Sequence, residues 1–134
     1  MFPAAKYTFL IITTSLTILN GCSPKPNSEP SAAYFVESNK KNEPSIIKTI
    51  ASFSKNKGYI PVGKIDDIND YYVYQFYRID SQILVMKSRN KQGIDVIFYK
   101  SGGPISKSDL QMKGIGEEFK KAIEDGGVFI SESD

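Results

Sequence analysis

The sequence contains no histidine, no tryptophan and only one cysteine among its 134 residues. Without histidine the chain cannot build a Ser-His-Asp or Cys-His catalytic site, and it lacks the side chain that most often serves as general base or zinc ligand. A single cysteine also excludes a disulfide within the chain. These absences favour a protein that is not an enzyme, with no catalytic residues, no metal and no cofactor.

A strong net charge is lacking as well. The chain has 17 basic and 15 acidic side chains, which gives a formal net charge of +2. Proteins that bind nucleic acid usually present a strongly basic face, so we expect no nucleic-acid partner. Basic residues are nevertheless in excess between Arg78 and Lys107, and acidic ones from Glu117 to the end. This distribution predicts either two solvated faces that attract each other within the fold or a basic sheet edge that meets an anionic partner.

The N-terminal residues contain an apolar run that is too short to cross a bilayer. It extends from Tyr7 to Leu19 after a single positive charge at Lys6, whereas a spanning helix needs about 20 apolar residues. A charged start, an apolar middle and small residues at the end form the order of an export signal. The sequence therefore predicts a cleaved signal over residues 1–21.

The end of this signal reads Leu19-Asn20-Gly21-Cys22. It resembles the signal box of bacterial lipoproteins, which has an aliphatic, a variable and a small residue before an obligatory cysteine. The resemblance covers residues 1–22 only. It implies that the chain is cut after Gly21 and that Cys22 carries a thioether-linked diacylglycerol, with the new amino group as a site for a further chain such as palmitate. A buried structural cysteine after an ordinary signal is the alternative.

The resemblance also implies where the protein is located. Two or three acyl chains, at about 0.8 kcal/mol per buried methylene, would make the anchoring effectively permanent. Ser23 stands where an aspartate would imply retention in the inner membrane, so the expected location is the periplasmic side of the cell outer membrane. The membrane is then the first partner, through the N-terminal diacylglyceryl cysteine.

Residues 22–45 combine the lipidated cysteine with a segment rich in Pro, Ser, Asn and Lys. That composition predicts a flexible linker with one apolar island, Tyr34-Phe35-Val36. About 23 residues would average roughly 25–30 Å end to end as a coil, so the folded part would sample a wide shell of periplasm. The island is either an incidental apolar cluster or a docking segment.

Residues 46–134 are expected to form one compact α+β domain. Apolar residues at helical spacing predict one helix from Ser45 to Gly58 and a second from Ser106 or Ser108 to Gly126. Between them, short polar connections join strand-like runs, which predicts an antiparallel meander over 71–79, 82–89 and 94–100. A segment near residue 60 or 130 could supply a fourth strand. The sequence therefore predicts a small antiparallel sheet of three to four strands with two flanking helices.

The second predicted helix contains two glycines in its first half, Gly114 and Gly116. Each glycine in a helix costs roughly 1 kcal/mol relative to alanine. We therefore expect the firm part of this helix to begin only near Gly116.

Both faces of the predicted sheet carry apolar residues. In the first run Tyr72, Tyr74 and Phe76 share one face, because side chains alternate along a strand. A meander with one face in water should show polar residues there, so each face needs a cover. Either the helices and the 59–65 segment cover both faces within the chain, or the aromatic face formed by Tyr72, Tyr74 and Phe76 is a partner or self-association surface, since tyrosine favours interfaces.

The motifs that offer chemistry are weak. The run Asp66-Asp67-Ile68-Asn69-Asp70 supplies oxygen ligands for calcium, but it lacks the glycine and the distant glutamate of a calcium loop, which favours a solvated loop. A hydrolase that uses carboxylates alone would need two acidic residues to converge in a cleft. The candidates are Asp66, Asp67, Asp70, Glu117 and Glu118.

Together these features predict a membrane-anchored periplasmic lipoprotein whose small non-catalytic domain binds another envelope protein or stabilises an envelope complex. A carrier of lipid or of a cell-wall fragment is one alternative, and it requires an enclosed apolar cavity. An immunity lipoprotein that neutralises a toxin is another, as a special case of protein binding.

Overall fold

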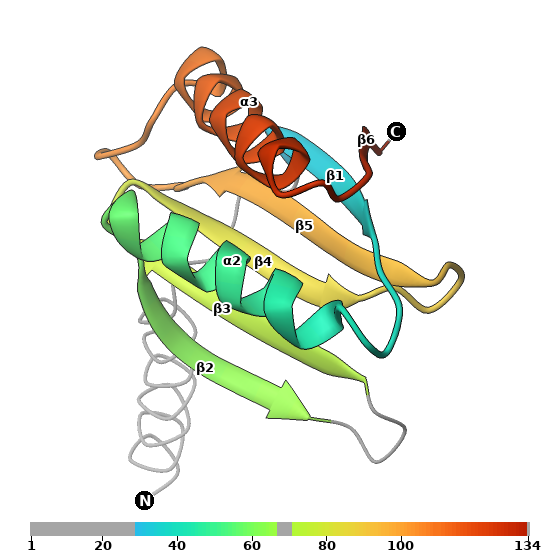
Figure 1. Ribbon diagram of the computed structural model, residues 1–134. Coiled ribbons are helices and arrows are strands. Elements are labelled where there is room, and N and C mark those ends of the chain that lie inside the picture. Colours follow the sequence, from blue (N-terminus) through green and yellow to red (C-terminus); the bar gives the residue numbers. More distant parts are fainter. Residues whose placement is uncertain (1–28, 67–70, 134) are drawn as a thin grey trace, which may run out of the picture.

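The computed structural model describes residues 29–66 and 71–133, with the backbone alone at 64–66. The described elements are β1 (Ala32–Glu37), α2 (Glu43–Asn56), β2 (Ile60–Asp66), β3 (Tyr72–Arg78), β4 (Ser81–Lys87), β5 (Gly93–Lys100), α3 (Asp109–Asp125) and β6 (Ile130–Glu132). Their strands form one six-stranded antiparallel sheet in the order β2-β3-β4-β5-β1-β6 (Figure 1). The predicted α+β class is confirmed, and the predicted three to four strands are corrected to six.

The strand β1 lies where the sequence predicts a flexible linker. It pairs with β5 on one side and β6 on the other, and Ala32 stands opposite Phe98. Tyr34 and Val36 are only 3% and 0% exposed. The linker predicted over residues 22–45 is therefore wrong from Ala32 onward. Burial of the apolar island stabilises an extended strand there, although the surrounding residues are rich in Pro and Ser. Residues 22–28 lie outside the described part.

The helix α2 begins two residues before the predicted N-cap, Ser45. Asn42 precedes its first turn, and Pro44 lies within that turn. Proline fits there because the first N–H groups of a helix have no partner inside the helix. The chain leaves the helix through Gly58, whose φ of +85° is in the left-handed region that favours glycine.

The helix α3 begins with a capping box, which confirms Ser108 as its N-cap. The Ser108 hydroxyl accepts a hydrogen bond from the Gln111 N–H at 3.1 Å, and the Gln111 side chain accepts one from the Ser108 N–H at 2.9 Å. The helix is continuous from its first turn, so the expected start near Gly116 is wrong. Gly116 instead permits close packing, since a Cβ there would lie 2.6 Å from the Tyr34 hydroxyl oxygen.

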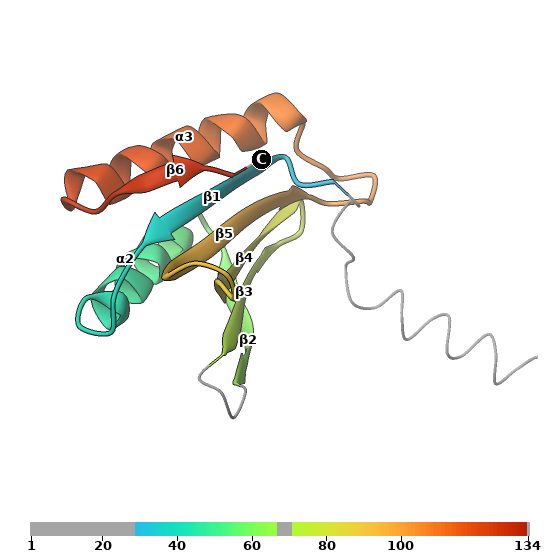
Figure 2. The same cartoon turned by 90° about the vertical axis from the view of Figure 1, so that its right-hand side faces the viewer.

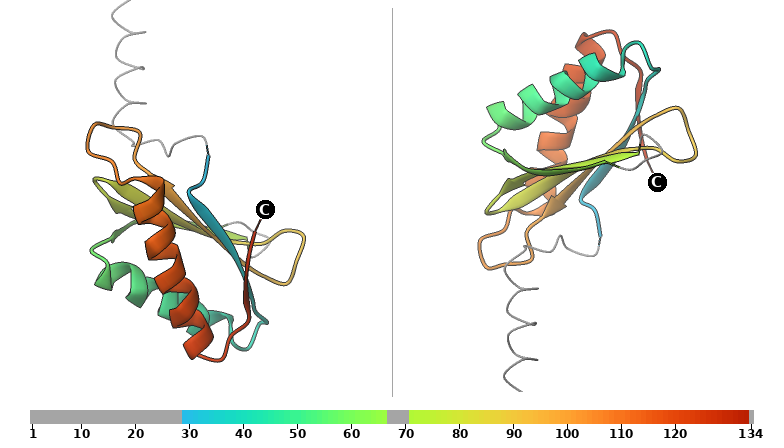
Figure 3. Two further views of the ribbon diagram at one scale, coloured as in Figure 1. Left: turned by 90° about the horizontal axis from the view of Figure 1, so that it is seen from above. Right: turned by 90° about the horizontal axis from the view of Figure 1, so that it is seen from below.

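Both described helices lie on the same face of the sheet, as Figure 2 and Figure 3 show. The helix α3 packs over β1, β5 and β6 and contacts α2, which lies in front of β3 and β4 in Figure 1. The space between helices and sheet is filled by one hydrophobic cluster, including rings of Tyr34, Phe98 and Phe119 at centroid distances of 5.5 to 5.9 Å. The helices therefore cover one face, and the prediction that elements of this chain cover both faces is wrong for the described residues.

Candidate binding surface

The face of the sheet opposite the helices is covered by no element of the described part (Figure 3). Strand register places its side chains in three rows across the sheet. We define the open face by these rows: Ile60, Tyr77, Gln82 and Tyr99; then Gln75, Leu84, Ile97 and Ala33; then Val73, Met86, Asp95 and Phe35. Most of these side chains are half-buried by their neighbours across the strands. The result is a broad surface of aliphatic and aromatic groups.

Two side-chain amides interrupt this apolar surface. The Gln75 side-chain Nε2 donates a hydrogen bond to the Gln82 side-chain Oε1 at 2.7 Å. Gln82 is 1% exposed although it lies on the open face, and its register neighbours are Tyr77 and Tyr99. A buried polar group that is hydrogen-bonded costs little, so the pair is stable among the rings.

Two basic side chains lie at one end of the open face. The Arg89 guanidinium lies 4.0 Å from the centroid of the Tyr71 ring, and the Lys91 ammonium lies 5.1 Å from that of Phe35. Both belong to the connection between β4 and β5, within the stretch where the sequence shows an excess of basic residues. Nearby, burial raises the pKa of Asp95. A hydrogen bond from Ser88 and the charge of Lys91 act in the opposite direction but do not outweigh burial.

The aromatic residues that the sequence predicts as a partner surface lie on the other face, beneath α2. Phe76 is 7% exposed, and the Tyr72 hydroxyl donates a hydrogen bond to the Glu43 carboxylate of that helix. Burial and this hydrogen bond raise the pKa of Tyr72. Tyr74 packs against Tyr72 with ring centroids 5.3 Å apart. Phe76 is buried, and Tyr72 and Tyr74 are half-buried, on the face of the sheet that α2 lies against. The possible partner surface at these three residues stays a prediction.

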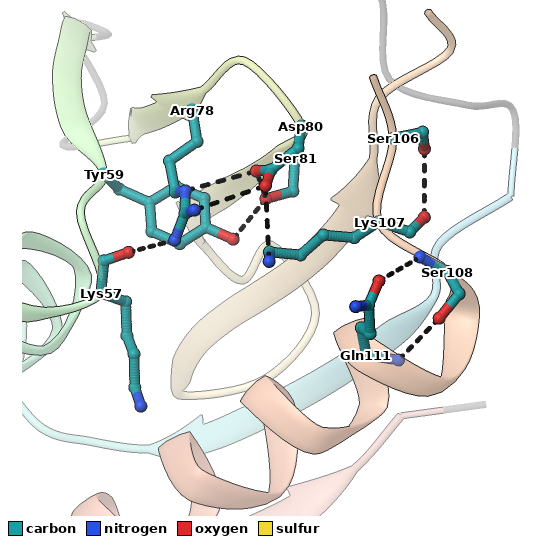
Figure 4. A network of polar contacts seen from close by, with 9 residues as sticks. All are labelled: Lys57, Tyr59, Arg78, Asp80, Ser81, Ser106, Lys107, Ser108 and Gln111. Atoms are coloured by element: carbon teal, nitrogen blue, oxygen red, sulfur yellow. Dashed lines mark hydrogen bonds and ion pairs between the residues drawn. The ribbon is translucent and has the colours of Figure 1, made fainter. Parts of the chain in front are cut away.

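A polar network holds the opposite end of the sheet together (Figure 4). The Tyr59 and Ser81 hydroxyl oxygens lie 2.6 Å apart, and Ser81 donates to the Asp80 carboxylate at 2.9 Å. Arg78 and Lys107 lie 3.3 and 3.4 Å from the same carboxylate. Burial opposes its charge, but the Ser81 hydrogen bond and these two cations outweigh that effect and lower the pKa of Asp80. Every polar group here is paired, which indicates a structural role.

Of the acidic residues considered for catalysis that the structure describes, Glu117 and Glu118 are adjacent on α3, and Asp66 lies on β2. Glu118 on α3 pairs with Lys57 at 2.6 Å, and Glu117 lines a surface pocket on the same helix. Asp66 ends β2 at the far edge of the sheet, while Asp67 and Asp70, with the rest of the calcium candidate, lie outside the described residues. In the described ranges, no three acidic or cysteine side chains are grouped to hold a metal ion.

The described part also contains surface pockets. One, of about 350 Å³, is lined by residues that include Tyr34, Lys113, Glu117 and Glu132. Burial, with the charges of Glu117 and Glu132, raises the pKa of the Tyr34 hydroxyl to about 12. Another pocket, of about 340 Å³, is lined largely by polar residues at the far end of β1. Neither has the enclosed apolar character that a lipid carrier requires.

The signal box, Leu19, Asn20 and Gly21 with the lipidation site Cys22, lies outside the described residues. Among the residues that are described, no helix has the length and apolar character of a membrane span.

Comparison with known proteins adds no relative from which a role could be transferred. No protein-family model, no curated protein and no solved structure matches this chain significantly.

Proposed function

We propose that this chain is a membrane-anchored lipoprotein of the bacterial envelope, and that its small non-catalytic domain binds another envelope protein through the open face. The observation that carries the proposal is a largely apolar sheet face left uncovered in a domain whose helices pack on the other face. An antiparallel sheet with one face in water normally has polar residues there. Here Leu84 and Ile97 occupy central positions instead, and Val73 lies in the next row.

The chemistry of the open face identifies the kind of partner. Aromatic residues, methionine and arginine are enriched at protein interfaces, and the open face and its basic end provide all three. Arg89 and Lys91 stack on rings at one end, where Asp95 is a neighbouring acid. The partner is therefore a protein with apolar side chains opposite the centre and acidic side chains opposite Arg89 and Lys91. Such charge complementarity sets orientation and association rate.

The lipid anchor is supported by the box that ends at Cys22, the one cysteine of the chain. An anchored domain meets other envelope proteins at a raised effective concentration, so a weak interface suffices for stable association. In the carrier alternative the apolar ligand would need a cavity, and the polar pockets at Tyr34 and at the far end of β1 favour protein binding over it. An immunity lipoprotein is the case in which the partner is a toxin.

Photocrosslinking in the native envelope tests this proposal. A photoreactive residue at position 77 of the open face should give one dominant adduct with another protein. The same residue at position 74, on the covered face of the same strand, is the matched control and should give little. Mass spectrometry would identify the adduct, which should be lost in Ile97→Arg and reduced in Cys22→Ala. Equal labelling from both positions, or adducts with the same chain only, would contradict the proposal.

A further inference from the structure

The chain enters the described domain beside the first turn of α3. The Ser31 hydroxyl donates a hydrogen bond to the Asp109 carboxylate at 2.9 Å. The loop between β5 and α3 lies at the same end (Figure 2), and the β3–β4 turn is tied to it because the Lys107 N–H donates to the Asp80 carbonyl oxygen at 3.2 Å. We call this end, formed by residues 31, 79–81 and 100–110, the tether pole.

The tether that leads to this end is short. Eight residues, 23–30, lie between Cys22 and Ser31, and the nine steps from one to the other reach roughly 30 Å when fully extended. As a coil it averages about 15–18 Å. The strand β1 and the start of α2 lie within residues 22–45, which the composition predicts as a linker. If Cys22 is held in the bilayer as proposed above, a tether of this length keeps the tether pole closer to the lipid than the opposite end of the domain.

Three strongly exposed apolar side chains lie at the tether pole. Ile79 is 64% exposed, Ile105 is 58% exposed and Leu110 is 81% exposed, the highest value among the large apolar residues of the described part. They come from three separate segments: the β3–β4 turn, the β5–α3 loop and the first turn of α3. None belongs to the hydrophobic cluster beneath the helices. Their exposure has no explanation within the domain itself.

Basic side chains accompany these apolar groups. Lys100 and Lys107 lie in the pole and pair with Asp109 and Asp80 at 3.3 and 3.4 Å. Arg78 shares the Asp80 carboxylate, and Lys113 follows one turn after Leu110 on α3. Within the pole Lys100 and Lys107 balance the two carboxylates, and the adjoining Arg78 and Lys113 add two further cations. Exposed apolar groups surrounded by basic ones are the pattern of a surface that rests on anionic lipid headgroups.

We infer that the tether pole rests on an anionic phospholipid surface, with Ile105 and Leu110 inserted at the headgroup level. This inference rests on the proposed lipid anchor at Cys22. A membrane is favoured over a protein as the occupant because the apolar residues project from three separate segments, and because the short tether brings this end, rather than any other, to the lipid.

Fluorescence of single labelled sites tests the inference on the full, acylated chain in vesicles of phosphatidylethanolamine and phosphatidylglycerol. Leu110→Cys and Ile105→Cys would each carry an environment-sensitive label, which finds one target because the thioether at Cys22 does not react and the chain has no other cysteine. The matched control is Phe129→Cys, 65% exposed beyond the other end of α3. Lipid-borne quenchers should quench the labels at 105 and 110 several-fold more than the label at 129, and phosphatidylcholine vesicles should reduce this difference.

A longer tether supplies a second measurement. Inserting a Gly-Ser segment after Ser28 leaves the described domain intact and should weaken quenching at 110, because the pole is then no longer held near the bilayer. Equal quenching at 105, 110 and 129 would overturn the contact. The mass of the acylated Cys22 peptide, measured on the same samples, separates the two failures: a missing acyl chain refutes the proposed anchor, whereas acylated protein with unquenched labels refutes only the contact of the pole.

Discussion

Asp80 joins several segments through one carboxylate and one carbonyl. Its side chain is held by Ser81, Arg78 and Lys107, and its carbonyl oxygen accepts from the N–H groups of Ser101 and Lys107. No buried polar side-chain atom lacks a partner in the part of the chain that the structure describes. Leaving buried donors unpaired costs free energy, so the residue is more important to stability than a surface acid.

We expect Asp80→Asn to lower the free energy of unfolding by about 1–3 kcal/mol at neutral pH, because charged hydrogen bonds are lost. Since the folded protein lowers the pKa of Asp80, its contribution is present above the ordinary value of 3.8 and is lost as the pH falls through the folded value. Urea unfolding at several pH values should therefore show the difference between wild type and variant shrinking in acid. Glu37→Gln, at an exposed site, is the control, and a difference that grows in acid would contradict this account.

The two glycines of α3 differ in their surroundings and should respond to substitution in opposite directions. A Cβ at Gly114 would meet no atom within 4 Å, whereas one at Gly116 would lie 2.6 Å from the Tyr34 hydroxyl. Gly114→Ala should stabilise by up to about 1 kcal/mol through helix propensity. Gly116→Ala should destabilise by about 1–3 kcal/mol through overpacking. Thermal unfolding compares the two, and adding Tyr34→Phe to Gly116→Ala should recover part of the loss.

At the scale of the strand, adjacent positions of β5 test which face is covered. Val96 is 0% exposed beneath the helices, and Ile97 lies on the open face. Val96→Arg places an unpaired charge in the core and should prevent folding, because a buried charge costs several kcal/mol. Ile97→Arg should cost less than about 1.5 kcal/mol, since a long side chain on an uncovered face reaches water. Circular dichroism and urea unfolding would distinguish them, and equal loss in both would contradict the open face.

The sequence identified most elements but could not assign the faces of the sheet. Alternation placed Tyr72, Tyr74 and Phe76 correctly on one side of β3, yet a strand with apolar residues on both sides does not show which side the helices take. That choice depends on where α2 and α3 pack. The excess of basic residues that includes Arg89 and Lys91 was visible, whereas their stacking on Tyr71 and Phe35 follows only from the register.

The strand β1 was missed because its partners are distant in sequence. Tyr34-Phe35-Val36 is a short apolar run among prolines and polar residues, and local composition outweighs it. Its stabilisation comes from pairing with β5 and β6 and from burial beneath α3. A short stretch of sequence around residue 34 does not contain those partners, which lie at residues 93–98 and 130–132. The same long-range pairing raised the strand number above the three to four that local patterns predict.

At the scale of the whole molecule, the boundary of the domain is testable by truncation. A chain that begins at Glu29 keeps β1 and should unfold cooperatively. A chain that begins at Ser38 loses the core residues Tyr34 and Val36 and separates β6 from the sheet, so it should not fold. Far-ultraviolet circular dichroism with urea titration checks both. If the shorter chain unfolded as cooperatively as the longer one, β1 would be dispensable, as the linker interpretation requires.

The pairing of β1 with β6 also governs when the protein can fold. The first and the last described strands are neighbours, with Val36 opposite Ile130, so the sheet is complete only when nearly the whole chain is available. Contacts between such distant segments make folding slow relative to helical domains of similar size. A nascent chain that lacks its C-terminal residues has β1 without one partner and α3 unfinished. For a chain that is exported before it folds, as the proposed signal implies, incomplete pairing of β1 would delay closure of the sheet until β6 has arrived.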